Sequence, residues 1–171
     1  MDAARYAAIE TLRDGRAIEI RALRPGDRDG LLLALQESSA ESRYRRFFSG
    51  KSRFSDDEIA YFLDIDFSTH VALVAVDERG RGAIVGGGRY ILIGPEKAEV
   101  AFFVVDRCQG NGMGAALMRH LAAIGGKAGL RELSADVLAD NAAMLKVFRN
   151  SGLQVQTARE ADVVHVALLL P

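Results

Sequence analysis

The sequence has little of several things, and each shortage excludes a class of protein. It contains one cysteine, Cys108, so no disulfide can form within the chain, and we expect a reducing, cytoplasmic setting. No run reaches the roughly 18 apolar residues that a membrane-spanning helix needs. Neither sign of charge dominates, because 22 Lys and Arg stand against 23 Asp and Glu. Proteins that bind the phosphates of nucleic acid usually have a basic surplus, so we expect neither nucleic acid nor a membrane as partner.

The chain also lacks signs of a metal site and of a modular organisation. Its three histidines, His70, His120 and His165, are scattered without zinc-site spacing, so we expect no metal and assign these histidines to packing. Residues 1–16 lack the apolar stretch of a secretory signal, and we interpret them as an N-terminal helical extension. With 171 residues, no internal repeat and no linker, a single domain over 1–171 is the simplest organisation.

The pattern of apolar residues predicts a mixed α+β fold. Ser55 and Glu58 have the spacing of a capping box at a helix start, and Asp27 and either Asp140 or Asn141 are candidate N-caps. We expect the helix after residue 114 to lose order at Gly125 and Gly126. The predicted strands are 17–23, 70–77, 83–92, 98–106, 131–138, 153–158 and 162–170, with helices at 27–38, 39–48, 55–66, 115–130 and 139–152.

The most informative stretch is residues 108–114, "CQGNGMG", which lies between a predicted strand and a predicted helix. A P-loop is excluded because Gly114 is followed by two alanines instead of Lys and Ser or Thr. The loose dinucleotide pattern fits, but a dinucleotide fold places it in the first strand–helix turn, whereas here a three-strand meander precedes it. A tight turn without ligand stays open, although three glycines lose much backbone entropy on folding. A helix N-terminus behind such a loop can also hold a phosphate group.

The residues Gln109-x-x-Gly112-x-Gly114 resemble the signature of the GNAT acetyltransferase superfamily. The segments 39–48, 55–66, 72–80, 98–118 and 138–153 are together most similar to the catalytic domain of bacterial Pat-type protein lysine acetyltransferases. The resemblance implies a central, mostly antiparallel sheet of about seven strands with helices on both faces. It also implies acetyl-CoA as co-substrate, with its pyrophosphate on the loop. The implied cofactor-binding residues are Phe102, Phe103, Val104, Gln109, Gly110, Asn111, Gly112, Met113, Gly114 and Asn141.

The resemblance also assigns a catalytic base, Glu99, ten residues before Gln109. A carboxylate entering an otherwise apolar strand would have its pKa raised by loss of water, which suits a base. The alternative is that Glu99 only faces solvent near the preceding turn. Many family members have a tyrosine acid seven residues after the asparagine of the last helix, where this chain has Phe148. A nucleophilic role for Cys108 lacks a nearby histidine, and we expect a buried residue there.

These features imply transfer of an acetyl group to a primary amine, with a protein lysine as the expected acceptor. An acyl-CoA synthetase is one candidate protein, and a small amine is the alternative. The basic and aromatic residues 43–48 either form a solvated helix face or line the acceptor groove. Because a tyrosine is missing at position 148, a non-catalytic module that senses acetyl-CoA is the alternative from another class.

Overall fold

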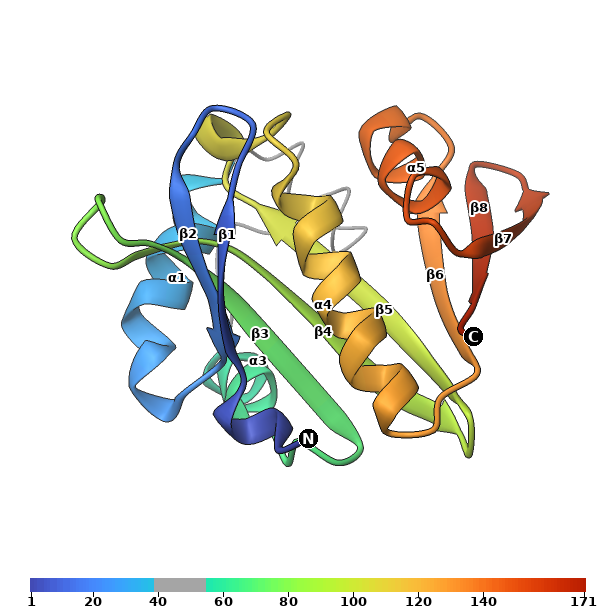
Figure 1. Cartoon of the computed structure of the whole chain (residues 1–171), viewed down its shortest axis with the longest axis horizontal. Helices are drawn as coiled ribbons and strands as arrows, with labels where there is room; N and C mark the ends of the chain where they lie inside the picture. The colour runs from blue at the N-terminus through green and yellow to red at the C-terminus, as the bar shows by residue number, and fades with distance from the viewer. Residues whose placement is uncertain (39–54) are drawn as a thin grey trace.

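The computed structural model describes residues 1–38 and 55–171 and shows one eight-stranded sheet with helices on both faces (Figure 1). The strand order is β1-β2-β3-β4-β5-β6-β8-β7, and every neighbouring pair is antiparallel except β5 and β6. The predicted fold class is confirmed, with eight strands in place of about seven. The strands are β1 Ala7–Thr11, β2 Ala17–Ala22, β3 His70–Asp77, β4 Ala83–Gly94, β5 Lys97–Val104, β6 Glu132–Leu138, β7 Gln154–Glu160 and β8 Val163–Leu169.

The helices divide between the two faces of the sheet. Helix α4 lies across β4 and β5 on the face seen in Figure 1, where Leu121 packs against Phe102 at Gly88. Helices α1 and α3 pack on the opposite face, with Gly30 against the side chain of Ile84. None of the helices in 1–38 and 55–171 has the length and apolar content that crossing a bilayer requires. The helices are α1 Arg28–Glu37, α3 Asp56–Leu63, α4 Met113–Lys127 and α5 Ala142–Arg149, with 3₁₀ turns at Ala3–Arg5, Pro25–Asp27 and Asp106–Cys108.

The extra strand arises where a helical extension was predicted, and that prediction for 1–16 is wrong. Residues 7–11 form β1 and pair with β2 in a hairpin, from Ala7 opposite Arg21 to Thr11 opposite Ala17. Alternate side chains, those of Tyr6, Ala8 and Glu10, are half-buried, which is the period of a strand. Local helix propensity of the alanines is overridden here by pairing with β2, the next strand in the chain.

Helix α4 continues through Gly125 and Gly126, so the predicted loss of order there is also wrong. Gly125 is buried, and the side chain of Leu130 folds back onto it. A Cβ at position 125 would stand 3.0 Å from Cδ1 of Leu130, and the Leu130 N–H donates to the Gly125 carbonyl oxygen. The glycine therefore allows the turn after α4 to close tightly on the helix.

Helix starts follow the sequence more closely. Ser55 and Glu58 form the predicted capping box of α3, each side chain accepting from the other residue's backbone N–H. Asp27 precedes α1, but its carboxylate binds Arg21 and the Arg24 N–H instead of capping the helix.

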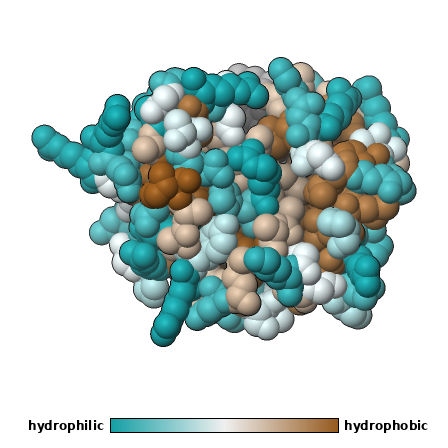
Figure 2. Space-filling view, in the orientation of Figure 1, coloured by the Kyte–Doolittle hydropathy of each residue, from teal (hydrophilic) through white to brown (hydrophobic). Residues whose placement is uncertain are grey.

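The core runs through both faces of β3, β4 and β5, while α4 leaves β6, β7 and β8 uncovered, and hydrophobic residues gather there on the surface (Figure 2).

Candidate functional site

A cleft of about 420 Å³ opens where β5 and β6 diverge. The two strands run parallel and pair at three positions, from Lys97–Glu132 to Glu99–Ser134. Beyond these pairs the cleft separates residues 100–104 of β5 from residues 135–137 of β6, and the start of α4 and one side of α5 complete its wall (Figure 1). Strand edges that have parted present N–H and C=O groups to the space between them. An extended ligand with amide groups can pair with such edges.

The three glycines of the loop before α4 serve different purposes. Gly110 and Gly112 have φ angles of 80° and 91°, in the left-handed region where a side chain is strained. Gly112 is also the residue at which α4 is capped. Gly114 lies in the first turn of α4, and a Cβ there would be 3.3 Å from Cγ2 of Val147 on α5. The first two glycines shape the loop, whereas the third lets α4 and α5 approach each other.

Gln109 ties the loop to the end of β5. Its Nε2 donates to the carbonyl oxygen of Val104 at 3.1 Å and lies 3.5 Å from the carboxylate of Asp106. The backbone N–H of Gln109 donates to the carbonyl oxygen of Asp106. This side chain therefore fixes the position of the glycine loop relative to the strand that forms one wall of the cleft.

The structure brings nine of the ten predicted cofactor-binding residues to this cleft. Asn111 does not line it, because its carbonyl oxygen turns toward the β1–β2 hairpin and accepts from the Arg13 N–H at 3.2 Å. Whether these residues hold a cofactor stays a prediction. Those that line the cleft are Phe102, Phe103, Val104, Gln109, Gly110, Gly112, Met113, Gly114 and Asn141.

Asn141 lines the cleft and also caps α5. Its Oδ1 accepts from the N–H of Met144 at 3.2 Å, and the residue is buried. Phe148 is buried in the same wall, with its ring centroid 6.1 Å from that of Phe102. Cys108 is fully buried, and its sulfur accepts from the guanidinium of Arg16 at 3.3 Å. The expected burial of this cysteine is therefore observed, at a position where the sulfur also borders the cleft.

Glu99 stands where β5 and β6 separate. It is the last residue of β5 that pairs with β6, opposite Ser134, and it faces the side of the sheet on which α1 and α3 pack. The side chain is exposed, so the loss of water that we expected for a carboxylate on an apolar strand is absent. Glu99 is outside the cleft lining among the described residues, whereas the next residue, Val100, is part of it. Its role as a base stays a prediction.

Sequence reasoning missed the charged residues of the cleft. Arg13 of the β1–β2 turn and Lys146 of α5 line the cleft, as does Asp136 of β6. Arg13 lies in the segment that was predicted to be helical, so no local signal could have placed it there. The last residue of β6 that pairs with β5 is Ser134, and Asp136 lies two residues after it, beyond Ala135. Only the tertiary arrangement brings these three side chains around one space.

The three histidines differ from one another in ways that the sequence did not indicate. His70 is buried as expected, whereas His120 contacts Tyr6 and Glu10 across the α4 surface. His165 is exposed and is paired with Asp136 at 2.5 Å, so its assignment to packing is wrong. The hydrogen bond that His165 Nδ1 donates to Asp136 and the charge of that carboxylate raise the pKa of His165. No group of three His, Cys, Asp or Glu side chains within 1–38 and 55–171 is arranged to hold a metal ion.

Two further predictions concern residues 39–48, where we expect a helix and part of the groove that binds the acyl acceptor. The predicted helix at 39–48 and the groove lining by residues 43–48 lie outside the described residues. Leu35 and Ser38 of the chain just before them border the cleft from the α1 side of the sheet. Described residues from both faces of the sheet therefore line the cleft, with the glycine loop near α4 and Leu35 near α1.

Comparison with known proteins finds acetyltransferases among the relatives of this chain. Acetyltransferase Pat of Mycolicibacterium smegmatis is 33% identical over 143 residues, which cover 82% of this chain and 42% of that protein. Acetyltransferase PA5475 of Pseudomonas aeruginosa is 35% identical over 138 residues, covering 80% of this chain and 74% of that protein. The crystal structure of the GNAT domain of S. lividans PAT has a TM-score of 0.88 and 34% identity, covering 96% and 97% of the two chains. The chain thus spans about two-fifths of the M. smegmatis protein.

The family model for GNAT acetyltransferases matches residues 35–153, which include the glycine loop, both walls of the cleft and α5. Enzymes of this family take their acetyl group from acetyl-CoA. The diverging strands, the glycine loop at the start of α4 and the matching residues lead to one conclusion: this chain belongs to the acetyltransferase (GNAT) family.

Proposed function

We propose that residues 1–171 form one catalytic domain that transfers an acetyl group from acetyl-CoA to the side-chain amine of a protein lysine. The observation that carries this proposal is the distribution of charge around the cleft. Two cations, Arg13 and Lys146, border it together with the glycine loop. Carboxylates occur toward β6 and the point where the strands part, at Asp136 and Glu99. An anionic cofactor and a cationic amine would thus each meet charge of the opposite sign.

The cleft suits the parts of acetyl-CoA. The N-terminus of α4, a helix of 15 residues, directs backbone N–H groups and a positive dipole toward the loop, which favours a pyrophosphate. The pantetheine arm is extended and contains amides, so it can pair with the parted edges of β5 and β6. From Glu99 to Val104 the strand spans about 17 Å at about 3.3 Å per residue. The thioester would then lie toward Glu99 and the phosphates toward Gln109.

Glu99 would act as the base for the attacking amine. A lysine ammonium with a pKa of about 10.4 is about 4 to 5 kcal/mol from its neutral, nucleophilic form at pH 7. Glu99 accepts the proton, directly or through water, because the side chain is exposed and stands at the last pair between β5 and β6, next to Val100 of the cleft lining. The amine nitrogen forms a bond to the acetyl carbon, and the bond between that carbon and sulfur breaks. The electron pair leaves with CoA as a thiolate.

The thiolate leaves without a tyrosine acid in this chain. Phe148 occupies that position and is buried against Phe102, so no hydroxyl group extends into the cleft from there. A thiol with a pKa near about 8.5 is a good leaving group without strong assistance. Phe148 also favours the second candidate, a module that binds acetyl-CoA without turnover. The likeness to Pat supports a protein lysine as acceptor. An acyl-CoA synthetase is our candidate protein, with a small amine as the alternative.

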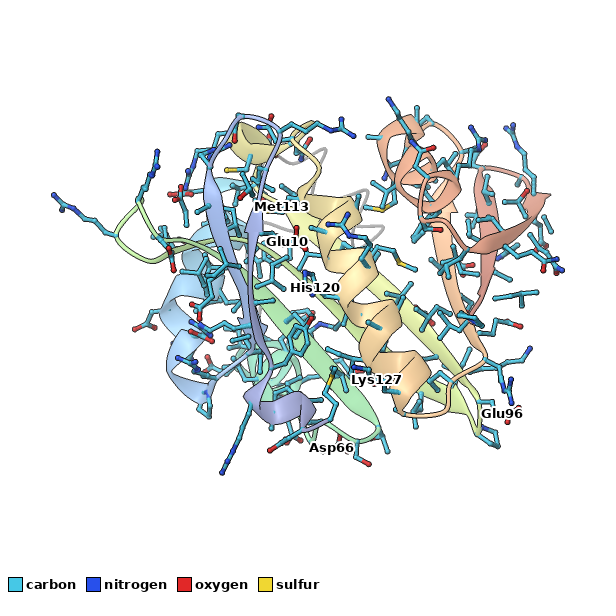
Figure 3. All side chains as sticks on the ribbon, viewed as in Figure 1. Glu10, Asp66, Glu96, Met113, His120 and Lys127 are labelled. Carbon is cyan, nitrogen blue, oxygen red and sulfur yellow. The ribbon has the colours of Figure 1, made fainter. Side chains whose placement is uncertain are left out.

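Release of CoA thiol separates these candidates. The chain is incubated with acetyl-CoA and a panel of acyl-CoA synthetases, other lysine-containing proteins and polyamines, and acetylated lysines are identified by mass spectrometry. Glu99→Gln should lower kcat by about 10²- to 10⁴-fold while acetyl-CoA still binds. The matched control is Glu96→Gln, which changes the same charge in the adjacent turn (Figure 3). Binding without turnover on any acceptor would support the sensor, and absence of acetyl-CoA binding would refute both.

A further inference from the structure

The turn of the β1–β2 hairpin rests on the glycine loop. The Arg13 N–H donates to the carbonyl oxygen of Asn111 at 3.2 Å. Nε of Arg13 would lie 3.8 Å from a Cβ placed on Gly112, so the guanidinium stands beside the residue at which α4 begins. Figure 1 shows the hairpin turn and this loop at the same end of the molecule. Arg13 also lines the cleft, although its side chain comes from the opposite edge of the sheet.

Contacts between the hairpin and α4 hold this arrangement in place. Glu10 of β1 accepts from Nε2 of His120 at 2.8 Å and from Arg119 at 3.1 Å. The hydroxyl of Tyr6 binds Nδ1 of the same histidine. Figure 3 shows Glu10 and His120 facing each other between β1 and α4. Since α4 and the hairpin are joined along their length, the position of Arg13 over the start of α4 is fixed by the fold.

The charge of Arg13 has no carboxylate partner within residues 1–38 and 55–171. Three other arginines near the hairpin and the start of α4 have carboxylate partners. Arg16 binds Asp14, Arg107 binds Glu37, and Arg119 binds Glu10. An exposed arginine beside a helix N-terminus meets a repulsive positive dipole unless an anion lies between them. The fold nevertheless holds this cation there.

We propose that Arg13 binds a phosphate group of the acyl donor, so that the N-terminal hairpin forms part of the cofactor site. This inference rests on the proposed use of acetyl-CoA in the cleft. The ligand chemistry is a phosphate monoester or a pyrophosphate diester, whose charged oxygens the planar guanidinium can bind through two parallel N–H groups. Acetyl-CoA offers two such sources, its pyrophosphate and its 3′-phosphate. The glycine loop would supply backbone N–H groups, and Arg13 would add a charged side chain from a distant part of the sequence.

The test compares Arg13→Gln, Arg13→Lys and the control Arg79→Gln, which lies in the turn between β3 and β4. Dissociation constants of acetyl-CoA are measured by calorimetry at low and at high salt, and thermal unfolding checks that each variant folds. Arg13→Gln should weaken binding about tenfold at low salt, as expected for one charge-assisted contact. The difference should shrink at high salt because the ion pair is screened. Arg13→Lys keeps the charge but not the two parallel N–H groups, so its loss of affinity should be smaller than that of Arg13→Gln, and Arg79→Gln should bind normally.

A parallel titration with 3′-dephospho-acetyl-CoA identifies the phosphate. A loss confined to acetyl-CoA would assign Arg13 to the 3′-phosphate, and a loss on both donors would assign it to the pyrophosphate. Normal binding by Arg13→Gln would overturn the inference, as would an equal, salt-independent loss in both variants, which would indicate packing alone. If the unaltered protein binds no acetyl-CoA, the proposed function itself fails. If it binds and turns over normally while Arg13→Gln is unchanged, only this inference fails.

Discussion

Acid should destabilise this protein through His70, a buried histidine on β3. Its Nε2 accepts from Nη1 of Arg89 at 3.1 Å, and the Arg89 guanidinium lies 4.8 Å above the ring of Phe62. Burial, followed by the charge of Arg89, lowers the pKa of His70 to about 4, against a smaller opposing effect of Asp66 and Asp64. The folded protein therefore keeps this imidazole neutral well below the pH at which an unfolded chain protonates it.

The sign and size of the effect follow from these two pKa values. Above pH 6.5 His70 is neutral in both states and has no influence on the free energy of unfolding. As the pH falls from 6.5 toward 4, only the unfolded state takes up the proton, so the folded state loses stability. The loss reaches about 2.5 kcal/mol at pH 4.5 and about 3 kcal/mol at pH 4, and it is complete, at about 3.4 kcal/mol, well below pH 4.

Urea unfolding at a series of pH values from 7.5 to 4.5 measures this loss. The comparison is with His70→Gln, whose side-chain oxygen can accept from Arg89 but does not titrate. Other groups affect both proteins equally, so the difference between their free energies of unfolding should change by about 2.5 kcal/mol, to the disadvantage of the histidine at low pH. His165→Gln is the comparison of opposite sign, because the pKa of His165 is raised and the histidine there should be favoured at low pH. Parallel curves for the unaltered protein and His70→Gln would refute the reasoning.

Three further outcomes are expected. Gly112→Ala should lower the free energy of unfolding by about 1 kcal/mol because φ is 91° there, and it should weaken acetyl-CoA binding; unchanged urea midpoint and affinity would contradict this. Asn141→Ala should destabilise by about 1 kcal/mol through loss of the cap bond to the Met144 N–H, and an unchanged thermal midpoint would show that the bond contributes nothing. Asp136→Asn should lower the pKa of His165 in an NMR titration, since Asp136 is the main cause of its rise; a constant pKa would exclude that pair in solution.

The sequence predicted most elements because their signals are local. The run 70–77 became β3 with the predicted bounds, and the capping box at Ser55 and Glu58 formed as expected. Residues 7–11 were misread because their strand is made by pairing with β2 and by contacts to α4, which no nearby residue signals. The helix at Gly125 was misread for the same reason, since Leu130 fills the space that the glycine leaves.

The part of the candidate site that the sequence predicted is the glycine loop, because the GNAT-like motif lies in it. The glycine loop and the wall at 102–104 were found from the family resemblance, and all but Asn111 of the predicted binding residues line one cleft. Arg13 and Lys146 were missed because they reach the cleft from other parts of the chain. The exposure of Glu99 was also missed, because alternation along a strand does not reveal which face stays open at a point where two strands separate.

The short ladder between β5 and β6 has a mechanical consequence. Among the described residues, five strands on one side and three on the other share three residue pairs in the sheet, and packing of α5 against α4 and Phe102 adds further contact. The two parts of the sheet, β1–β5 and β6–β8, are therefore connected over a short length. A ligand that pairs with both parted strands would connect them further, so that binding in the cleft would reduce the motion of one part of the sheet relative to the other.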